Sequence, residues 1–321
     1  MSTVTRGGSS RRANPQQGAS AALSLTRKNP RYGEKLVMGL LAAAAGMSVL
    51  ITIGIFLALL IPSISFFKEV PILDFLTGTR WAPRFADADF GIVPLITGTL
   101  WTTLIGLLIA VPVGLAAAVF LSEYAPDRVR RFLKPVLEIL AGIPSVVYGY
   151  FALYFVAPVF LKGLLGIEVG TFSVLAAGLV LGIMIIPTVA SLSEDAMSAV
   201  PQSLRQGSYA LGANKMRTTL RVVFPAAISG ITASIVLALS RAVGETMIVA
   251  LAAGTRAQIV TNPTENGQTM TGFIAQTATG ESSPGSLTYN TLFAVGLLLF
   301  LITLLINIVA GIIVRRIREV Y

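Results

Sequence analysis

The chain has 321 residues, of which 54% are hydrophobic and only 12% are charged, a balance typical of an integral membrane protein rather than a soluble domain. It contains neither cysteine nor histidine. Thiol nucleophiles, disulfide bonds, Cys/His metal sites and imidazole acid–base chemistry are therefore excluded for this chain.

Residues 1–31 are polar and basic, and we predict that they form a disordered tail. The stretch is rich in Gly, Ser, Gln and Arg. It has too few apolar side chains to offset the conformational entropy lost on ordering. The remainder, residues 32–321, is predicted to form a single transmembrane domain.

Six apolar stretches are long enough to cross a bilayer, which takes about 20 residues of helix. Several of them contain proline, which membrane bundles tolerate because neighbouring helices satisfy the freed carbonyl groups. Asn307, in the last stretch, is expected to make an interhelical hydrogen bond. We predict an all-α polytopic membrane protein with six transmembrane helices at residues 36–61, 92–121, 136–161, 171–192, 226–253 and 292–314.

The distribution of basic residues predicts the orientation of these helices. Segments on the same side as the N-terminus carry 18 Lys and Arg residues, whereas the loops on the opposite side carry five. Since cytoplasmic segments are enriched in Lys and Arg, both termini are predicted to be cytoplasmic. This asymmetry also accounts for the net charge of +9, so we expect no nucleic-acid partner.

Between the fourth and fifth predicted spans, residues 201–225 are expected to form two short helices joined at a glycine. Gly212 suits a turn with positive φ, and Asn214 suits the cap of the second helix. That helix has an apolar side and a cationic side, which includes Arg217. Taken alone, such a segment is also typical of a helix pair lying on the membrane surface.

The fifth predicted span contains two ionisable residues, Arg241 and Glu245. If residues 226–253 form a regular helix, the i, i+4 spacing places both on one face, where they can neutralise each other. Ser234 lies one heptad before Arg241. We expect these three residues to line a translocation path, because a charge within a span is costly unless it faces water or a partner. The alternative is a purely structural ion pair.

Residues 206–225 resemble the EAA motif of permease subunits of ABC importers, which is the cytoplasmic loop that docks onto the ATPase. The glycine and the proline of the motif occur at its spacing, while Gln-Gly-Ser replaces the usual Glu-Ala-Ala. We call residues 201–225 the coupling segment. The resemblance implies that ATPase coupling involves Arg205, Gln206, Gly207, Ser208, Gly212, Arg217 and Pro225.

Two other stretches resemble phosphate permeases in particular. Residues 241–247 match their RAxGETM signature, and residues 142–149 resemble their third-helix signature. The first outer loop is more similar to PstC-type than to PstA-type subunits. In the third-helix signature, the resemblance singles out Gly142, Pro144, Ser145 and Tyr148.

The resemblance implies a PstC-type permease with the MetI-like fold of type I ABC importers, in which residues 32–321 form the permease domain. It further implies a PstA-type permease partner, two PstB-type ATPase subunits and an extracytoplasmic PstS-type binding protein. These would import inorganic phosphate across the bilayer of the bacterial inner membrane, without a cofactor in this chain.

The sequence agrees with this assignment of ATP hydrolysis to other chains. It contains no G-x-x-x-x-G-K-[ST] motif, so the chain is not expected to be an enzyme. Two alternatives stay open. One is a permease for another oxyanion, such as sulfate or molybdate, and the other is an ATP-independent secondary transporter or channel.

Cysteine labelling tests the predicted orientation on a background that has no native cysteine. We expect Ser203→Cys and Thr218→Cys to react with a membrane-impermeant maleimide only from the cytoplasmic side, and Ser282→Cys only from outside. The mass shift after labelling of inside-out and right-side-out vesicles measures this. Labelling of position 203 from outside would reverse the predicted topology.

Overall fold

The structure is a computed structural model that describes residues 32–85, 87–280 and 283–317. The predicted disordered tail, residues 1–31, lies outside the described residues. The chain divides into two units, Met1–Ile53 and Gly54–Tyr321, of which the second contains the helical bundle. The described residues are mainly helical and include no β-strand beyond an isolated bridge between Trp81 and Phe90.

The longer helices of the described chain alternate with short ones. The longer ones are α1 (Tyr32–Glu69), α3 (Val93–Val119), α4 (Asp127–Gly142), α6 (Val174–Ser198), α10 (Ile228–Val243) and α13 (Leu287–Ile317). The short ones are α2 (Ile72–Thr77), α5 (Ser145–Phe151), α7 (Gln202–Ala210), α8 (Lys215–Thr218), α9 (Phe224–Ala226), α11 (Met247–Ala252) and α12 (Met270–Ala278). The π-helical stretches η1 (Phe120–Tyr124), η2 (Ala152–Leu164) and η3 (Thr219–Val223) continue α3, α5 and α8.

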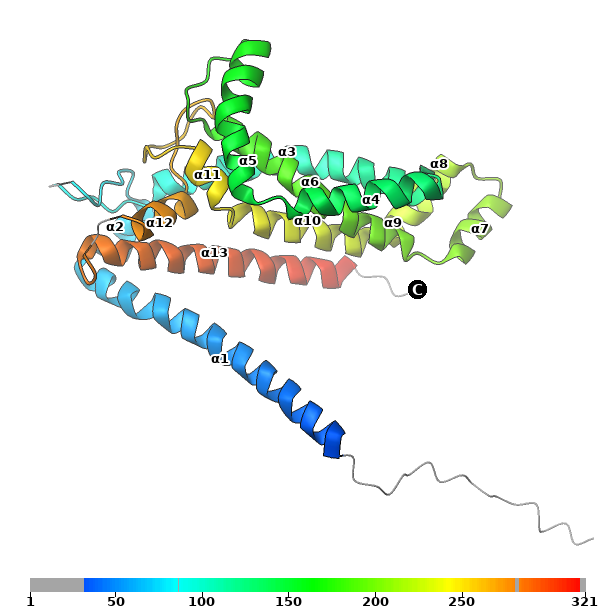
Figure 1. Cartoon of the computed structure of the whole chain (residues 1–321), viewed down its shortest axis with the longest axis horizontal. Coiled ribbons are helices and arrows are strands. Elements are labelled where there is room, and N and C mark those ends of the chain that lie inside the picture. The colour runs from blue at the N-terminus through cyan, green and yellow to red at the C-terminus, as the bar shows by residue number, and fades with distance from the viewer. Residues whose placement is uncertain (1–31, 86, 281–282, 318–321) are drawn as a thin grey trace, which may run out of the picture. The chain divides into compact units, whose positions relative to one another are not determined.

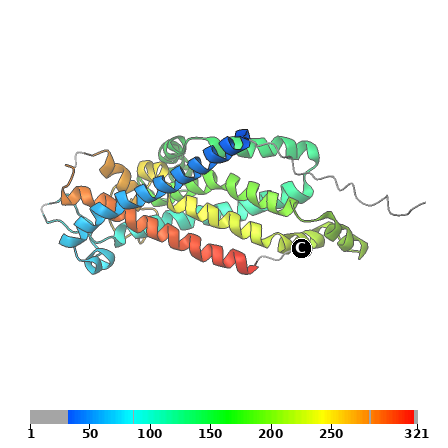
Figure 2. The same ribbon diagram turned by 90° about the horizontal axis from the view of Figure 1, so that it is seen from below.

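Within the second unit, α3, α6, α10 and α13 run alongside one another (Figures 1 and 2). Helix α6 is the central one, and its side chains Leu181, Met184 and Ile185 are fully buried. Helices α2 and α12 lie at one end of this bundle and α7 and α8 at the other (Figure 1). The predicted outer loops and the coupling segment are thus at opposite ends.

Glycines let α3 and α6 approach closely. Gly178 and Gly182 lie one turn apart on α6 and face Ile105 and Gly106 of α3. A Cβ atom at Gly182 would lie only 2.9 Å from the carbonyl oxygen of Gly106. A Cβ atom at Gly178 would lie 2.8 Å from Cβ of Ile105. These small residues therefore set the spacing of the central helix pair, as they commonly do in membrane bundles.

Among the residues that the structure describes, five helices are long and apolar enough to cross a membrane, and a sixth span results if the bent pair Lys215–Ala226 and Ile228–Val243 is counted as one. The predicted third span, residues 136–161, has the wrong bounds, since the apolar helix is Ser145–Leu164. Proline disfavours the helical conformation in the residue before it, so Ile143 is extended (ψ 130°) and α4 ends at Gly142. Helix α4 is a separate amphipathic helix with no buried residue.

The predicted fifth span, residues 226–253, is not one regular helix. Helix α10 ends at Val243, and α11 begins at Met247. The carboxylate of Glu245 accepts hydrogen bonds from the backbone N–H groups of Met247, at 3.0 Å, and Ile248, at 3.3 Å. These bonds satisfy donors that have no partner at the start of a helix, and they stabilise the break.

The predicted interhelical hydrogen bond of Asn307 is confirmed. The hydroxyl of Ser240 on α10 donates to the side-chain oxygen of Asn307 on α13 at 2.8 Å. Polar side chains of this kind join helices where apolar lipid supplies no hydrophobic driving force for association. The bond therefore ties α13 to the bundle.

The close approach of α3 and α6 can be tested by enlarging a glycine. Gly182→Leu is expected to destabilise the bundle by about 1–3 kcal/mol, because the new side chain has no room against α3. Gly311→Leu is the matched control, since a Cβ atom there meets nothing within 4 Å. Thermal unfolding of the purified protein in detergent measures both variants. Equal unfolding midpoints would contradict the packing described.

Candidate functional site

The turn chemistry of the coupling segment is as predicted. Gly212 has φ 81°, a conformation that glycine adopts without steric cost. The side-chain oxygen of Asn214 accepts a hydrogen bond from the N–H of Arg217 at 2.9 Å and so caps α8. The hydroxyls of Ser208 and Thr218 lie 2.9 Å apart and join α7 to α8. Because Thr218 is buried, it is a poor labelling position.

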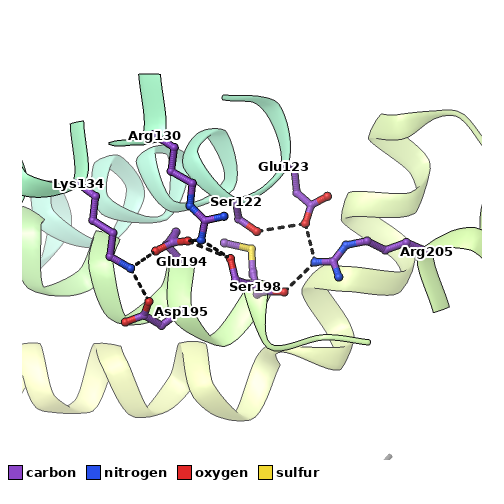
Figure 3. A network of polar contacts seen from close by, with 9 residues as sticks. Ser122, Glu123, Arg130, Lys134, Glu194, Asp195, Ser198 and Arg205 are labelled. Carbon is purple, nitrogen blue, oxygen red and sulfur yellow. Dashed lines mark hydrogen bonds and ion pairs between the residues drawn. The ribbon is translucent and has the colours of Figure 1, made fainter. Parts of the chain in front are cut away.

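Arg205, which is predicted to take part in ATPase coupling, is buried in this structure. Its guanidinium donates to the carboxylate of Glu123 at 2.9 Å, and the two side chains are only 8% and 4% exposed. It also donates to the backbone carbonyls of Met197, at 2.8 Å, and Val200. Arg205 thereby anchors α7 to η1 and to the end of α6 (Figure 3).

A second ionic cluster holds α4 against α6 (Figure 3). Glu194 is 1% exposed, and its carboxylate accepts from Arg130 and, at 2.8 Å, from Lys134. Lys134 also pairs with Asp195 at 2.7 Å. The hydrogen bonds to Asp195 and Glu194 raise the pKa of Lys134 above its usual 10.5. Sequence reasoning missed this cluster, although two adjacent acids at the end of a predicted span were a signal.

The other coupling residues are accessible, with Gln206, Gly207, Gly212, Arg217 and Pro225 exposed. An adjoining groove of about 420 Å³ combines apolar side chains with arginines. An exposed surface of this composition is typical of a protein interaction site. The groove is lined by Leu204, Ser208, Leu211, Gly212, Ala213, Arg217, Arg221 and Val222.

Arg241 and Glu245 lie at the break between α10 and α11. The guanidinium of Arg241, exposed in the last turn of α10, donates to the hydroxyl of Thr188 on α6 at 3.1 Å. No ion pair between Arg241 and Glu245 occurs among the residues that the structure describes, so the predicted mutual neutralisation is wrong. Each charge instead lies at the helix end whose dipole favours it.

Ser234 does not share the exposed environment of Arg241. It is buried between α10 and α6, where its hydroxyl lies 2.7 Å from that of Ser193. It also donates to the carbonyl of Ile231 at 2.8 Å. Ser234 therefore joins α10 to α6, and it precedes Val243, the last residue of α10, by more than two helical turns.

The third-helix signature forms the junction of α4 and α5. Gly142 is the last residue of α4, and Pro144 and Ser145 start α5. The hydroxyl of Tyr148 donates to the carbonyl of Leu140 across this junction at 2.9 Å. A Cβ atom at Gly149, the residue after Tyr148, would lie 3.2 Å from the carbonyl oxygen of Met247 on α11. The structure thus brings the signature residue Tyr148 toward the break between α10 and α11.

The structure thus combines a bundle of apolar helices with an exposed basic segment at one end and a broken helix that carries charge, which are features expected of a membrane permease. Residues 110–319 match the family model for the binding-protein-dependent transport system inner membrane component. The chain belongs to this family. Its predicted assignment to ABC importer permeases is thereby confirmed.

Curated relatives cover most of the chain. It is 35% identical to the probable ABC transporter permease protein YqgH of Bacillus subtilis, over 89% of this chain and 92% of that protein. It is 36% identical to the phosphate transport system permease protein PstC of Mesorhizobium japonicum, over 76% of this chain and 78% of that protein. Each alignment covers more than three quarters of both proteins.

Solved structures show the same fold. An inward-facing form of the MetNI methionine ABC transporter matches with a TM-score of 0.53 and 23% identity, over 70% of this chain and 97% of that chain. A bacterial ABC transporter that imports alginate matches with a TM-score of 0.60 and 16% identity, over 90% of this chain and 100% of that chain. The predicted MetI-like permease fold is confirmed.

The buried pair at the coupling segment leads to a stability prediction. Arg205→Met is expected to cost about 3–5 kcal/mol, because it leaves the carboxylate of Glu123 buried without a counter-charge, with only the hydroxyl of Ser122 as a donor among the described residues. Combining it with Glu123→Leu should restore most of this loss, since no unpaired charge is then buried. Thermal unfolding and limited proteolysis of the coupling segment measure both. A single variant as stable as the parent would show that the pair is not buried.

Proposed function

We propose that this chain is the PstC-type permease subunit of an ATP-driven phosphate importer. The observation that carries the proposal is Arg241, an exposed guanidinium without a carboxylate partner among the described residues, held at a helix break within the bundle. A guanidinium presents a planar fork of donors that matches phosphate oxygens, and it stays charged at every relevant pH. The relative named PstC supports phosphate as the substrate.

The broken helix suits anion passage for electrostatic reasons. Discontinuous helices recur at transport sites because their free ends carry dipoles and unpaired backbone groups. Arg241 donates a hydrogen bond to the neutral hydroxyl of Thr188, which is a weaker acceptor than a phosphate oxygen. An arriving phosphate therefore displaces Thr188 without breaking an ion pair.

Glu245 is proposed to select hydrogen phosphate and to keep it from binding too tightly. Its carboxylate is fixed by the N–H groups of Met247 and Ile248, close to Arg241 in the chain. It accepts a hydrogen bond from the protonated oxygen of hydrogen phosphate. Fully ionised sulfate has no such proton and meets only repulsion from the carboxylate.

Coupling to ATP hydrolysis is proposed to pass through the coupling segment. Its exposed groove receives an ATPase subunit. The ion pair between Arg205 and Glu123 then transmits the displacement of α7 to η1, which continues α3. The bond from Arg205 to the carbonyl of Met197 transfers it to α6. The proposed assembly contains a PstA-type permease, two PstB-type ATPases and a PstS-type binding protein, with both termini of this chain cytoplasmic in the bacterial inner membrane.

Substitution of Arg241 tests the proposed function. Arg241→Gln should lower phosphate uptake roughly a hundredfold or more, because it removes the charge that binds the desolvated anion. Glu245→Gln should impair uptake less. Uptake of labelled phosphate by proteoliposomes containing the whole importer and ATP is the measurement, with assembly checked by gel filtration.

A charge swap, Arg241→Glu with Glu245→Arg, tests whether the position of the cation at the break matters for transport. If a cation at either position were sufficient, the swapped variant would keep transport. A path in which the position of the cation matters gives an assembled but inactive importer, which is the expected result. Uptake near the parental level in the swapped variant would overturn the proposal.

A further inference from the structure

A cavity of about 430 Å³ is lined in part by α12. Helix α12 lies at the end of the bundle opposite the coupling segment (Figure 1). Residues 81–85 and 255–257 contribute to the lining of the cavity, together with side chains near and on α12. Trp81 and Phe273 form an aromatic wall, with ring centroids 4.9 Å apart and planes at 89°. None of the residues discussed above as coupling or path residues belongs to it.

The charged side chains that line this cavity are Arg84 and Arg256, and none of the lining residues is acidic. Both arginines are exposed, and neither takes part in an ion pair within the described chain. Arg84 makes only a long hydrogen bond, 3.4 Å, to the hydroxyl of Thr277. Arg256 also lines a neighbouring cavity with Glu168 and Glu265, but it forms no ion pair with either of them. Two guanidinium groups that form no ion pair attract an anionic group.

The aromatic side chains of the cavity indicate a ligand that has an apolar group as well as a negative charge. Trp81 is 5% exposed, and its indole N–H is buried without a hydrogen-bond partner among the described residues. Phe85, also lining the cavity, is 72% exposed. Exposed aromatic rings beside arginines are typical of the energetic centre of a protein interface.

We propose that this cavity receives an acidic side chain, flanked by an apolar one, from the extracytoplasmic binding protein. The inference rests on the proposed function and on the predicted orientation, and membership of a binding-protein-dependent family supplies the partner. A carboxylate pairs with Arg84 and Arg256, while the apolar neighbour packs on Phe85. A free phosphate ion would satisfy the arginines but leave the aromatic surface uncovered, so a protein segment fits better.

The test measures ATP hydrolysis by the whole importer in proteoliposomes as loaded binding protein is titrated on the outer side. Arg84→Glu and Arg256→Glu are each expected to raise the half-saturating concentration about tenfold and to leave the maximal rate unchanged, because like charges then face each other. Arg80→Glu is the matched control, since Arg80 is exposed on the same loop and does not line the cavity. It should shift the concentration less than about twofold.

Two results would overturn the inference. One is a half-saturating concentration that is the same in all three variants and the parent, and the other is an equal shift in all three, which would show only a general effect of charge. If binding protein does not stimulate the parental importer, the proposed function itself fails, and this outcome is distinguishable from the first two. Should a charge reversal prevent assembly, Arg84→Gln and Arg256→Gln replace it, with an expected shift of about threefold.

A second measurement distinguishes the occupants of the cavity. Inorganic phosphate alone, titrated by calorimetry onto the assembled importer, is expected to give no binding signal that Arg84→Glu removes. Such a signal would identify a free oxyanion site and contradict the proposal. Phe85→Cys, as the single cysteine of this chain, is expected to cross-link to a cysteine placed beside an acidic residue of the binding protein, and failure at every acidic position would contradict it as well.

Discussion

A backbone group inside a bilayer must find its hydrogen-bond partner within the protein, and side chains meet this requirement at two of the helix breaks in the described part of the chain. At the break between α4 and α5, the hydroxyl of Tyr148 donates to the carbonyl of Leu140, which otherwise accepts only a long bond, 3.4 Å, from the N–H of Ile143 among the described residues. At the break between α10 and α11, the carboxylate of Glu245 supplies an acceptor to the freed N–H groups. The hydroxyl of Thr271 completes this break by donating to the carbonyl of Glu245 at 2.6 Å. Tyr148 and Glu245, which belong to the two signature stretches, thus bind backbone groups at the breaks.

At the break between α10 and α11, the carboxylate of Glu245 binds backbone N–H groups of α11. Arg241 therefore lies beside the break without a carboxylate partner among the described residues. Arg241 occupies the last turn of α10, where the helix dipole favours a cation. A continuous helix would have placed Glu245 on the same face as Arg241 and favoured a closed ion pair. The break directs the carboxylate to the backbone of α11 instead. The same local irregularity therefore accounts for the geometry of the helix and for the availability of the guanidinium.

The sequence predicted features that depend on neighbouring residues better than those that depend on distant ones. The positive φ of Gly212 and the cap by Asn214 were predictable because a turn and a cap are decided within a few residues. The break after Val243 was not, because Gly-Glu-Thr interrupts an otherwise apolar run too briefly to alter its periodicity. The pairing of Arg205 with Glu123 joins residues far apart in the chain, and no spacing rule indicates it. The outer cavity likewise depends on loops brought together by the fold.

The groups around each arginine differ between Arg205, which has a structural role, and the arginines for which we propose a role in recognition. Arg205 is buried and neutralised by Glu123, and removing a charge from such a pair mainly affects stability. Arg241 has only a hydroxyl as its side-chain partner, and Arg84 and Arg256 line a cavity without an acid. A guanidinium with no carboxylate retains its full attraction for an incoming anion, since no ion pair has to be broken first. Exposed Arg80 likewise has no ion pair among the described residues, so neither its charge nor the absence of an acidic partner identifies a functional arginine. The proposed roles rest in addition on what lies beside the guanidinium, which is a helix break for Arg241 and a cavity for Arg84 and Arg256.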